Sequence, residues 1–281
     1  MIDLRDTINL RGLLRRRTRR PRAELVALVQ NQVEFVDEWI AYHRTIGFDN
    51  ITIYDNDSRD GTTERLAAWC RERWFSAMHW PTRKGQHLRH AAYADAVGLS
   101  RADFIGFFDI NEFLVLHQHD HVGDWLSALP QHAGAVAINR RLFGYDRDGS
   151  GPVIERVNQR IGGGTMAEHL PRSIARKSCL VEARSNLPSV VGQIVAPDAV
   201  PVQRGPRNTT LSLHREIAQI NRYGDIDAEE AEPFPDGEVV PFPALPAGRR
   251  APPLAAAPED RSAATMLERA ARANGAVARP A

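Results

Sequence analysis

The sequence is poor in the residues that build disulfide scaffolds, metal fingers and membrane spans. It holds two cysteines, Cys70 and Cys179, which lie too far apart in the chain to form a CxxC pair or a cluster of metal ligands. No run approaches the roughly 18 to 20 apolar residues that a transmembrane helix needs. The 36 basic and 35 acidic side chains give a formal charge of +1. No global field therefore favours a nucleic-acid partner.

Lysine is also scarce, because Lys84 and Lys177 are the only lysines and arginine carries the remaining positive charge. The 281 residues can bury a substantial core, and 43% hydrophobic residues is an ordinary globular value. The cysteine usage fits a reducing compartment, so we expect a cytoplasmic protein. Residues 1–22 mix apolar positions with many arginines and lack the charge order of a secretory signal. They predict a basic arm, either disordered or in peripheral contact with an anionic inner membrane face.

Beyond this arm, short apolar runs alternate with segments of helical periodicity. The apolar runs predict buried strands, and the spacing of apolar residues between them predicts amphipathic helices. Strands separated by helices of 10 to 15 residues form βαβ units, so the pattern indicates an α/β, Rossmann-like fold with a mainly parallel sheet. The expected strands cover residues 24–30, 50–57, 76–80 and 103–110, and the expected helices cover 33–46, 62–74 and 86–99.

The alternation loosens after residue 110. We expect a helix over 121–129, a strand over 134–144 that runs into a loop, and an extended piece over 152–157. The GGGT run at 162–165 is expected to be a loop, because no clear helix follows it. From residue 225 the chain is rich in Pro, Ala and acid, which predicts a low-complexity tail with one short helix at 263–274. The expected division is an arm (1–22), a domain (23–224) and a tail (225–281).

Carboxylates and amides follow three of the expected strands. Ligands bind at the carboxyl ends of the strands in an open parallel sheet, so we expect these side chains to form a polar site at one sheet edge. The groups are Gln30, Asn31 and Gln32 after the first strand, Asp55, Asn56 and Asp57 after the second, and Asp109, Asn111 and Glu112 after the fourth.

The stretch FFDINEF carries the most information within this group. Side chains of an extended chain alternate with period two, so Asp109 and Asn111 are expected on the same side. Oxygen ligands at that spacing suit Mg²⁺ or Mn²⁺, and they also suit a strand end whose Asp caps the next turn. Asp55 and Asp57 leave a similar choice open, between contact with a nucleotide and capping of a turn.

Three longer stretches carry a recognisable pattern. They are VQNQVEFVDEWIAYHRTIGFDNITIYDNDSRDGTTERL, FIGFFDINEFLVL and LFGYDRDGSGPVIERV. Over about residues 24–223 the chain resembles the family 2-like glycosyltransferases of the DUF23/family 92 type, whose signatures are approximately KNE, EWxxYHxxxGxxxxxxYDNxSxDGT and DxDEF. The resemblance implies a GT-A fold and transfer of a sugar, with inversion, from a nucleotide-sugar donor to an acceptor hydroxyl.

The resemblance also implies partners and roles for single residues. It implies a UDP-sugar as the favoured donor, a carbohydrate or lipid-linked acceptor, a divalent Mn²⁺ or Mg²⁺ ion, and a place in cell-surface polysaccharide synthesis. Carried over by position, Asn31 and Gln32 lie near the donor nucleotide, Asp55 and Asp57 contact the nucleoside, Lys84 helps to neutralise the phosphates, and Asp109, Asn111 and Glu112 face the metal and diphosphate. An inverting transfer needs a base for the acceptor hydroxyl. Glu155 is the preferred candidate and Asp146 the second.

The chain departs from the family pattern at three places. KNE reads Gln30-Asn31-Gln32, Asn111 replaces the second acid of DxD, and an NHY-like element reads Asn221-Arg222-Tyr223. These changes make a noncatalytic nucleotide- or sugar-binding relative the main alternative. A HAD-like phosphotransferase is a further alternative, because the apolar run before DIN resembles hhhhDxD, although that motif normally ends a first strand. His43 is expected to pack in the core.

Overall fold

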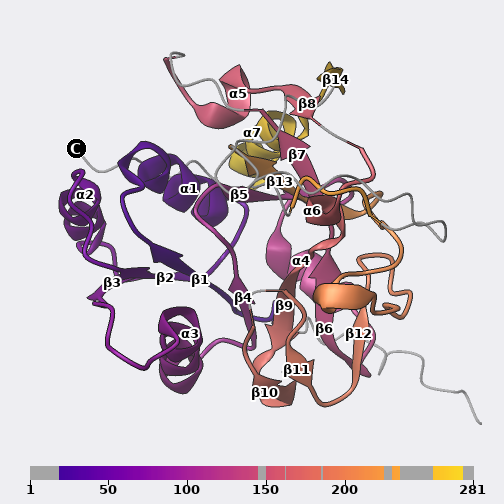
Figure 1. The fold of residues 1–281 in the computed structure, drawn as a ribbon, viewed down its shortest axis with the longest axis horizontal. Coiled ribbons are helices and arrows are strands. Elements are labelled where there is room, and N and C mark those ends of the chain that lie inside the picture. Colours follow the sequence, from indigo (N-terminus) through magenta and orange to yellow (C-terminus); the bar gives the residue numbers. More distant parts are fainter. Residues whose placement is uncertain are drawn as a thin grey trace, which may run out of the picture.

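The computed structural model of the protein describes residues 19–144, 150–161, 163–184, 186–224, 230–234 and 256–274. Within these ranges a seven-stranded and a five-stranded sheet share one hydrophobic core (Figure 1). Most of the predicted basic arm, residues 1–18, lies outside the described residues. No helix in the described ranges has both the length and the apolar character needed to cross a membrane.

The central sheet has the strand order β12-β6-β9-β4-β1-β2-β3. Strands β4, β1, β2 and β3 are parallel, β12 is parallel to β6, and β9 runs antiparallel to both β4 and β6. The predicted α/β fold with a mainly parallel sheet is confirmed. The strands are β1 (Ala23–Val29), β2 (Asn50–Asp55), β3 (Phe75–His79), β4 (Phe104–Phe107), β6 (Ala133–Ile138), β9 (Arg172–Arg176) and β12 (Gln193–Val195).

Helices cover both faces of this sheet. The side chains of β1 alternate between the two faces of the sheet, and all of them except that of Leu28 are buried. Both faces of the sheet are therefore covered at this strand. Leu25 belongs to the cluster that contains Trp39 of α1, whereas Val26 belongs to the cluster that contains Tyr93 of α3. Helices α1 and α2 lie on one side of the strands and α3 lies on the other (Figure 1). The helices are α1 (Val33–Thr45), α2 (Thr62–Trp69) and α3 (Leu88–Leu99).

The second sheet has the order β14-β8-β7-β13-β5. Its central strand β13 is parallel to β7 and antiparallel to β5. Its strands are β5 (Glu112–Leu116), β7 (Arg140–Phe143), β8 (Gln159–Ile161), β13 (Ala218–Tyr223) and β14 (Ala256–Glu259). The remaining elements are α4 (Val122–Ala128), α5 (Val153–Arg156), α6 (Met166–His169), the hairpin β10 (Leu180–Glu182) and β11 (Ser189–Val190), and α7 (Ser262–Asn274).

The predicted helix at 263–274 is present as α7, but it is not part of a detached tail. Its residues Ala263, Met266 and Ala270 are buried in the same core cluster as Trp39 of α1 and Leu116 of β5. Helix α7, which follows the boundary expected at residue 225, thus packs in the same core as α1 and β5.

Several element boundaries also differ from the sequence expectation. The strand expected over 103–110 ends at Phe107, and the strand expected over 134–144 divides at Asn139 into β6 and β7. The piece expected to be extended over 152–157 is helix α5, because both carboxylate oxygens of Glu38 accept hydrogen bonds from the backbone N–H groups at its start. A short helix, α6, does follow the glycine run.

His43 is buried in an aromatic cluster, as its place in the helical pattern predicted. It lies against the rings of Trp39, Phe108 and Phe113. Its Nδ1 lies 2.9 Å from the Trp39 carbonyl oxygen, and its Nε2 accepts a hydrogen bond from the Leu114 N–H at 3.3 Å. The carbonyl can only accept, so Nδ1 carries the proton and the ring is neutral. Burial lowers the pKa of His43 to about 3, despite the hydrogen bond to Trp39.

Candidate functional site

The carboxyl ends of β4, β1, β2 and β3 meet at one edge of the central sheet. Asp55 at the end of β2 pairs in register with Val29 of β1 and with His79 of β3. Phe107 at the end of β4 pairs with Val26 of β1. The polar residues that follow these strands therefore lie along the same edge, as the sequence predicted. This edge is called the carboxyl edge below.

The turns after β1 and β2 are bound to each other. The Asn31 N–H donates to Ser58 Oγ at 2.9 Å, and Asn31 Oδ1 accepts from the Arg59 N–H at 2.8 Å. The Gln32 N–H donates to Thr62 Oγ1 at 2.9 Å. Asn31 adopts a left-handed backbone conformation with φ of 53°, which asparagine tolerates better than most residues. Asn31 and Gln32 thus lie at the carboxyl edge, and their hydrogen bonds hold the turn after β1 against the turn after β2.

Asp55 and Asp57 have different surroundings. Asp55 is 4% exposed, and its oxygens accept from the Ser58 N–H at 3.2 Å and from Thr63 Oγ1 at 2.6 Å. These bonds correspond to the turn-capping role that the sequence left open. Asp57 is exposed and its Oδ1 lies 2.7 Å from Nε2 of His79. Asp57 is therefore the carboxylate of this turn that can reach a ligand, with His79 as a neighbour that the sequence analysis missed.

The remaining predicted residues lie on loops or on the second sheet. Lys84 is exposed on the loop between β3 and α3. Glu155 is exposed on α5, and Figure 1 shows α5 above β7 and β8, apart from the end of β4. Asp146, the second candidate base, lies outside the described residues. Helix α5, which carries Glu155, therefore lies apart from the strand end that precedes the acid motif.

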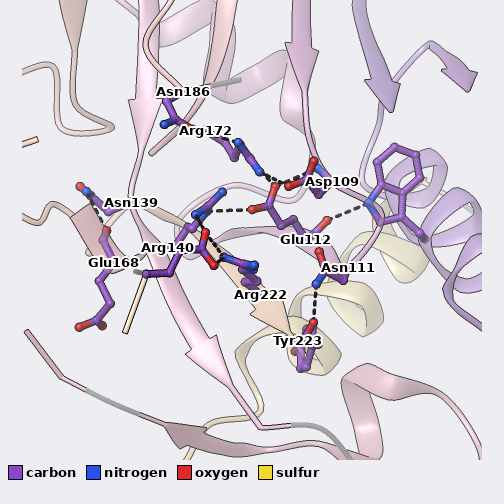
Figure 2. A network of polar contacts seen from close by, with 12 residues as sticks. Asp109, Asn111, Glu112, Asn139, Arg140, Glu168, Arg172, Asn186, Arg222 and Tyr223 are labelled. Carbon is purple, nitrogen blue, oxygen red and sulfur yellow. Dashed lines mark hydrogen bonds and ion pairs between the residues drawn. The ribbon is translucent and has the colours of Figure 1, made fainter. Parts of the chain in front are cut away.

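The acid motif forms a turn and not an extended chain. The Glu112 N–H donates to the Asp109 carbonyl at 3.0 Å, which closes the turn between β4 and β5. The prediction that Asp109 and Asn111 share one side is therefore wrong. Figure 2 shows that Asp109 points toward Arg172, whereas Asn111 points the other way, and its amide nitrogen donates to the Tyr223 carbonyl at 2.7 Å.

Arginines occupy both oxygens of Asp109. Arg89 Nη1 of α3 donates to Oδ1 at 2.6 Å, and Arg172 Nη2 of β9 donates to Oδ2. Burial opposes ionisation of Asp109, but the charges of Arg172 and Arg89 outweigh it, so the pKa of Asp109 lies well below its usual range. The two arginines therefore favour the ionised form of Asp109.

Glu112 is an internal counter-ion. Its side chain is fully buried, and Arg140 Nε lies 2.8 Å from Oε1. Oε2 accepts from Arg172 Nε and, at 2.9 Å, from the Asp109 N–H. Glu230 joins the same network by accepting from Arg222 Nη1 at 2.6 Å and from Arg140 Nη1 at 3.3 Å. We name the seven residues of this network the arginine cluster: Arg89, Arg140, Arg172, Arg222, Asp109, Glu112 and Glu230.

The donor set of the acid motif does not fit a divalent metal. A metal site needs carboxylate oxygens that converge on one point and are free to coordinate. Here Asp109 is held by Arg89 and Arg172, and Glu112 is buried between Arg140 and the same Arg172. Asn111 points away. No group of three or more His, Cys, Asp or Glu side chains is arranged to hold a metal within the ranges given above. The metal roles predicted for Asp109, Asn111 and Glu112 are not supported by their geometry.

The comparison with protein families confirms the resemblance inferred from the motifs. Residues 26–141 match the model of glycosyltransferase family 92. Glycosyltransferase family 92 proteins of Ricinus communis and Arabidopsis thaliana are 35% identical over 109 residues and 33% identical over 99 residues. These alignments span 37% and 34% of this chain but 18% and 17% of those proteins. The family match thus contains all or part of five of the seven strands of the central sheet, and the alignments cover a small part of each relative.

Solved glycosyltransferase structures share part of the fold. A mannosyltransferase from Pyrobaculum calidifontis, solved with GDP-Man and Mn²⁺, is 17% identical with a TM-score of 0.37, covering 44% of this chain and 37% of its own. Glucosyl-3-phosphoglycerate synthase from Mycobacterium tuberculosis, solved with Mn²⁺, UDP-glucose and phosphoglyceric acid, is 16% identical with a TM-score of 0.34, covering 57% and 58%. Values of this size describe a limited likeness of fold and bear on neither substrate nor metal.

Proposed function

We propose that this protein is a glycosyltransferase that binds a nucleotide-sugar donor at the carboxyl edge and transfers the sugar to an acceptor hydroxyl. The observation that carries the proposal is the match to glycosyltransferase family 92 over residues 26–141. That range contains the carboxyl ends of all four neighbouring parallel strands and the turns that follow them. The family likeness and the edge expected to bind ligands therefore coincide.

The polar groups of the edge suit the two ends of a nucleoside diphosphate. Asp57 and Asn31, at the turns after β2 and β1, suit the hydroxyls and base of the nucleoside. Lys84 and Arg89 lie on the loop after β3 and at the start of α3, and their positive charges suit the phosphates. A UDP-sugar is the donor that the family resemblance favours. A GDP-sugar is the second choice for the assay.

The proposed reaction is a single in-line displacement with inversion. The acceptor oxygen forms a bond to the anomeric carbon as the bond from that carbon to the diphosphate oxygen breaks, and the electron pair leaves with the nucleoside diphosphate. The hydroxyl proton passes to a general base. Glu155 stays the proposed base. Because Glu155 lies on α5, the acceptor hydroxyl must bind next to that helix. A carbohydrate or lipid-linked acceptor at the cytoplasmic face of a membrane belongs to this proposal.

One specific observation favours a second function. Asn111 lacks the charge of the acid that the family pattern carries there, and Asp109 is fully engaged by arginines. A noncatalytic protein that binds nucleotides or sugars would tolerate both changes. The hypothesis of a HAD-like phosphotransferase loses support, because that reaction needs a free aspartate as the nucleophile. Both carboxylate oxygens of Asp109 are paired with arginines, and Asp109 follows the fourth strand instead of the first.

A donor panel tests the proposed function. Thermal unfolding of the full chain is measured with UDP-glucose, UDP-N-acetylglucosamine or GDP-mannose at saturating concentration, both with Mn²⁺ and after metal removal. In a separate assay, folded protein is incubated with each donor and an acceptor pool, and release of nucleoside diphosphate is measured. A ligand at about 100 times its Kd stabilises the folded state by about 2.7 kcal/mol, so one donor is expected to raise Tm by about 5 °C. Stabilisation without any release would favour the binding protein. No stabilisation by any donor would contradict both functions.

A further inference from the structure

The arginine cluster carries more positive than negative charge. It pairs four guanidinium groups with three carboxylates, and Asp109 and Arg89 are its members nearest to solvent, 27% and 39% exposed. Within the cluster, burial and then the charge of neighbouring Arg172 lower the pKa of Arg140 to about 10, although Glu112 opposes the change. A group of buried charges with one sign in excess is stabilised by a counter-ion of the opposite sign.

Arg89 presents the excess charge at the carboxyl edge. Its Nη1 is fixed by Asp109 Oδ1 at 2.6 Å and by the Tyr93 hydroxyl at 3.1 Å. For its Nε and Nη2 we find no hydrogen-bond partner in the part of the chain that is described, and the side chain is 39% exposed. One side of the guanidinium is thus held in place beside Asp109, which follows the carboxyl end of β4. A planar fork of this kind binds phosphate oxygens with good geometry.

The same charges disfavour a divalent cation. Two unit charges of like sign about 4 Å apart repel by about 4 kcal/mol at the effective dielectric of a protein surface, and a divalent ion doubles that cost. A metal coordinated by Asp109 would have to displace Arg89 or Arg172 from it and then lie beside both. A diphosphate, by contrast, meets complementary charge without any change in the acid motif.

We propose that the arginine cluster, through Arg89, binds the diphosphate of the donor in place of a divalent metal ion. This inference rests on the proposed function and names how the same site holds the leaving group. As the bond from the anomeric carbon to the diphosphate oxygen breaks, the electron pair stays on that oxygen, and the guanidinium groups neutralise its charge. In this arrangement Asp109 is a positioning residue, because it orients Arg89 and Arg172 and does not itself touch the phosphates.

The test compares nucleoside diphosphates with monophosphates by calorimetry. The full chain is treated with EDTA and dialysed into metal-free buffer, and UDP, UMP, GDP and GMP are titrated with and without Mn²⁺. The expected result is that one diphosphate binds in metal-free buffer within about threefold of its Kd in Mn²⁺. A charged hydrogen bond contributes about 1.5–3 kcal/mol, so Arg89→Gln is expected to lower the preference for diphosphate over monophosphate by about tenfold or more.

Two further variants keep the result interpretable. Arg89→Lys retains the charge but not the fork, so it is expected to retain part of the preference. Arg269→Gln is the matched control, because Arg269 of α7 is 35% exposed and pairs with Asp120 at 2.7 Å, and it should bind like the parent. Thermal unfolding of each variant without nucleotide checks the fold.

The outcomes distinguish failure of this inference from failure of the proposed function. Diphosphate binding that requires Mn²⁺ would overturn the arginine site and leave the transferase proposal standing. Metal-free binding that Arg89→Gln does not weaken would also overturn it. Absence of binding by every nucleotide in both buffers would overturn the proposed function together with the inference.

Discussion

Replacing Glu112 by glutamine is expected to lower the free energy of unfolding by about 3–5 kcal/mol, because it removes one partner from a buried ionic network. Glu112 is fully buried, and its carboxylate faces the guanidinium groups of Arg140 and Arg172. The glutamine amide keeps the volume but cannot neutralise either charge, so two cations remain buried against a neutral group. Chemical denaturation followed by tryptophan fluorescence measures the loss.

The control for this variant is Glu182→Gln. Glu182 and Arg184 form an exposed ion pair with Oε2 to Nη2 at 2.7 Å and exposed fractions of 44% and 45%. Exposed pairs contribute about 0–1 kcal/mol, so this control should unfold almost like the parent. A Glu112→Gln protein that is as stable as the parent, but has lost Mn²⁺ binding, would restore the metal-side role that the family resemblance implied for Glu112.

The second large effect is expected in acid, where protonation of His43 opposes folding. Burial lowers the pKa of His43 to about 3 in the folded protein, against about 6.5 in the unfolded chain. The unfolded state therefore binds the proton first, and the contribution of His43 to stability is fully present above pH 6.5 and is lost as the pH falls toward 3. The loss is about 1.4 kcal/mol per pH unit, or roughly 3 kcal/mol by pH 4.

The structural reason lies in the two ring nitrogens of His43. A proton on Nε2 removes the acceptor for the Leu114 N–H and places a charge among aromatic rings. His43→Gln has no proton to gain, so its free energy of unfolding should change less between pH 7 and pH 4 than that of the parent, although it is less stable at pH 7. His132→Gln, at an exposed histidine, should keep the parental slope. Equal slopes for His43→Gln and the parent would contradict this account.

The sequence predicted the half of the fold that is set by local patterns. The local sequence located β1, α1, β2 and α3, because the order of apolar and polar residues within each segment indicates which of its side chains are buried. The carboxyl edge followed from the parallel arrangement alone. Helix α5 was missed because its start is capped by Glu38, which lies far away in the sequence.

The arginine cluster could not be predicted, for the same physical reason. Arg172 reaches Asp109 only because β9 runs antiparallel beside β4, and nothing near residue 172 signals that position. The period-two argument for Asp109 and Asn111 assumed an extended chain, whereas the backbone turns between them. The sequence showed that Arg222 replaces the histidine of the family pattern. It did not show that Arg222 pairs with Glu230.

The central claim is that the carboxyl edge binds the nucleotide sugar, and hydrogen–deuterium exchange on the full chain tests it most directly. The account predicts that a donor that raises Tm slows exchange in residues 30–32, 56–59, 80–89 and 109–112, while α7 (Ser262–Asn274) exchanges as before. Protection confined to other segments, with these four unchanged, would contradict it.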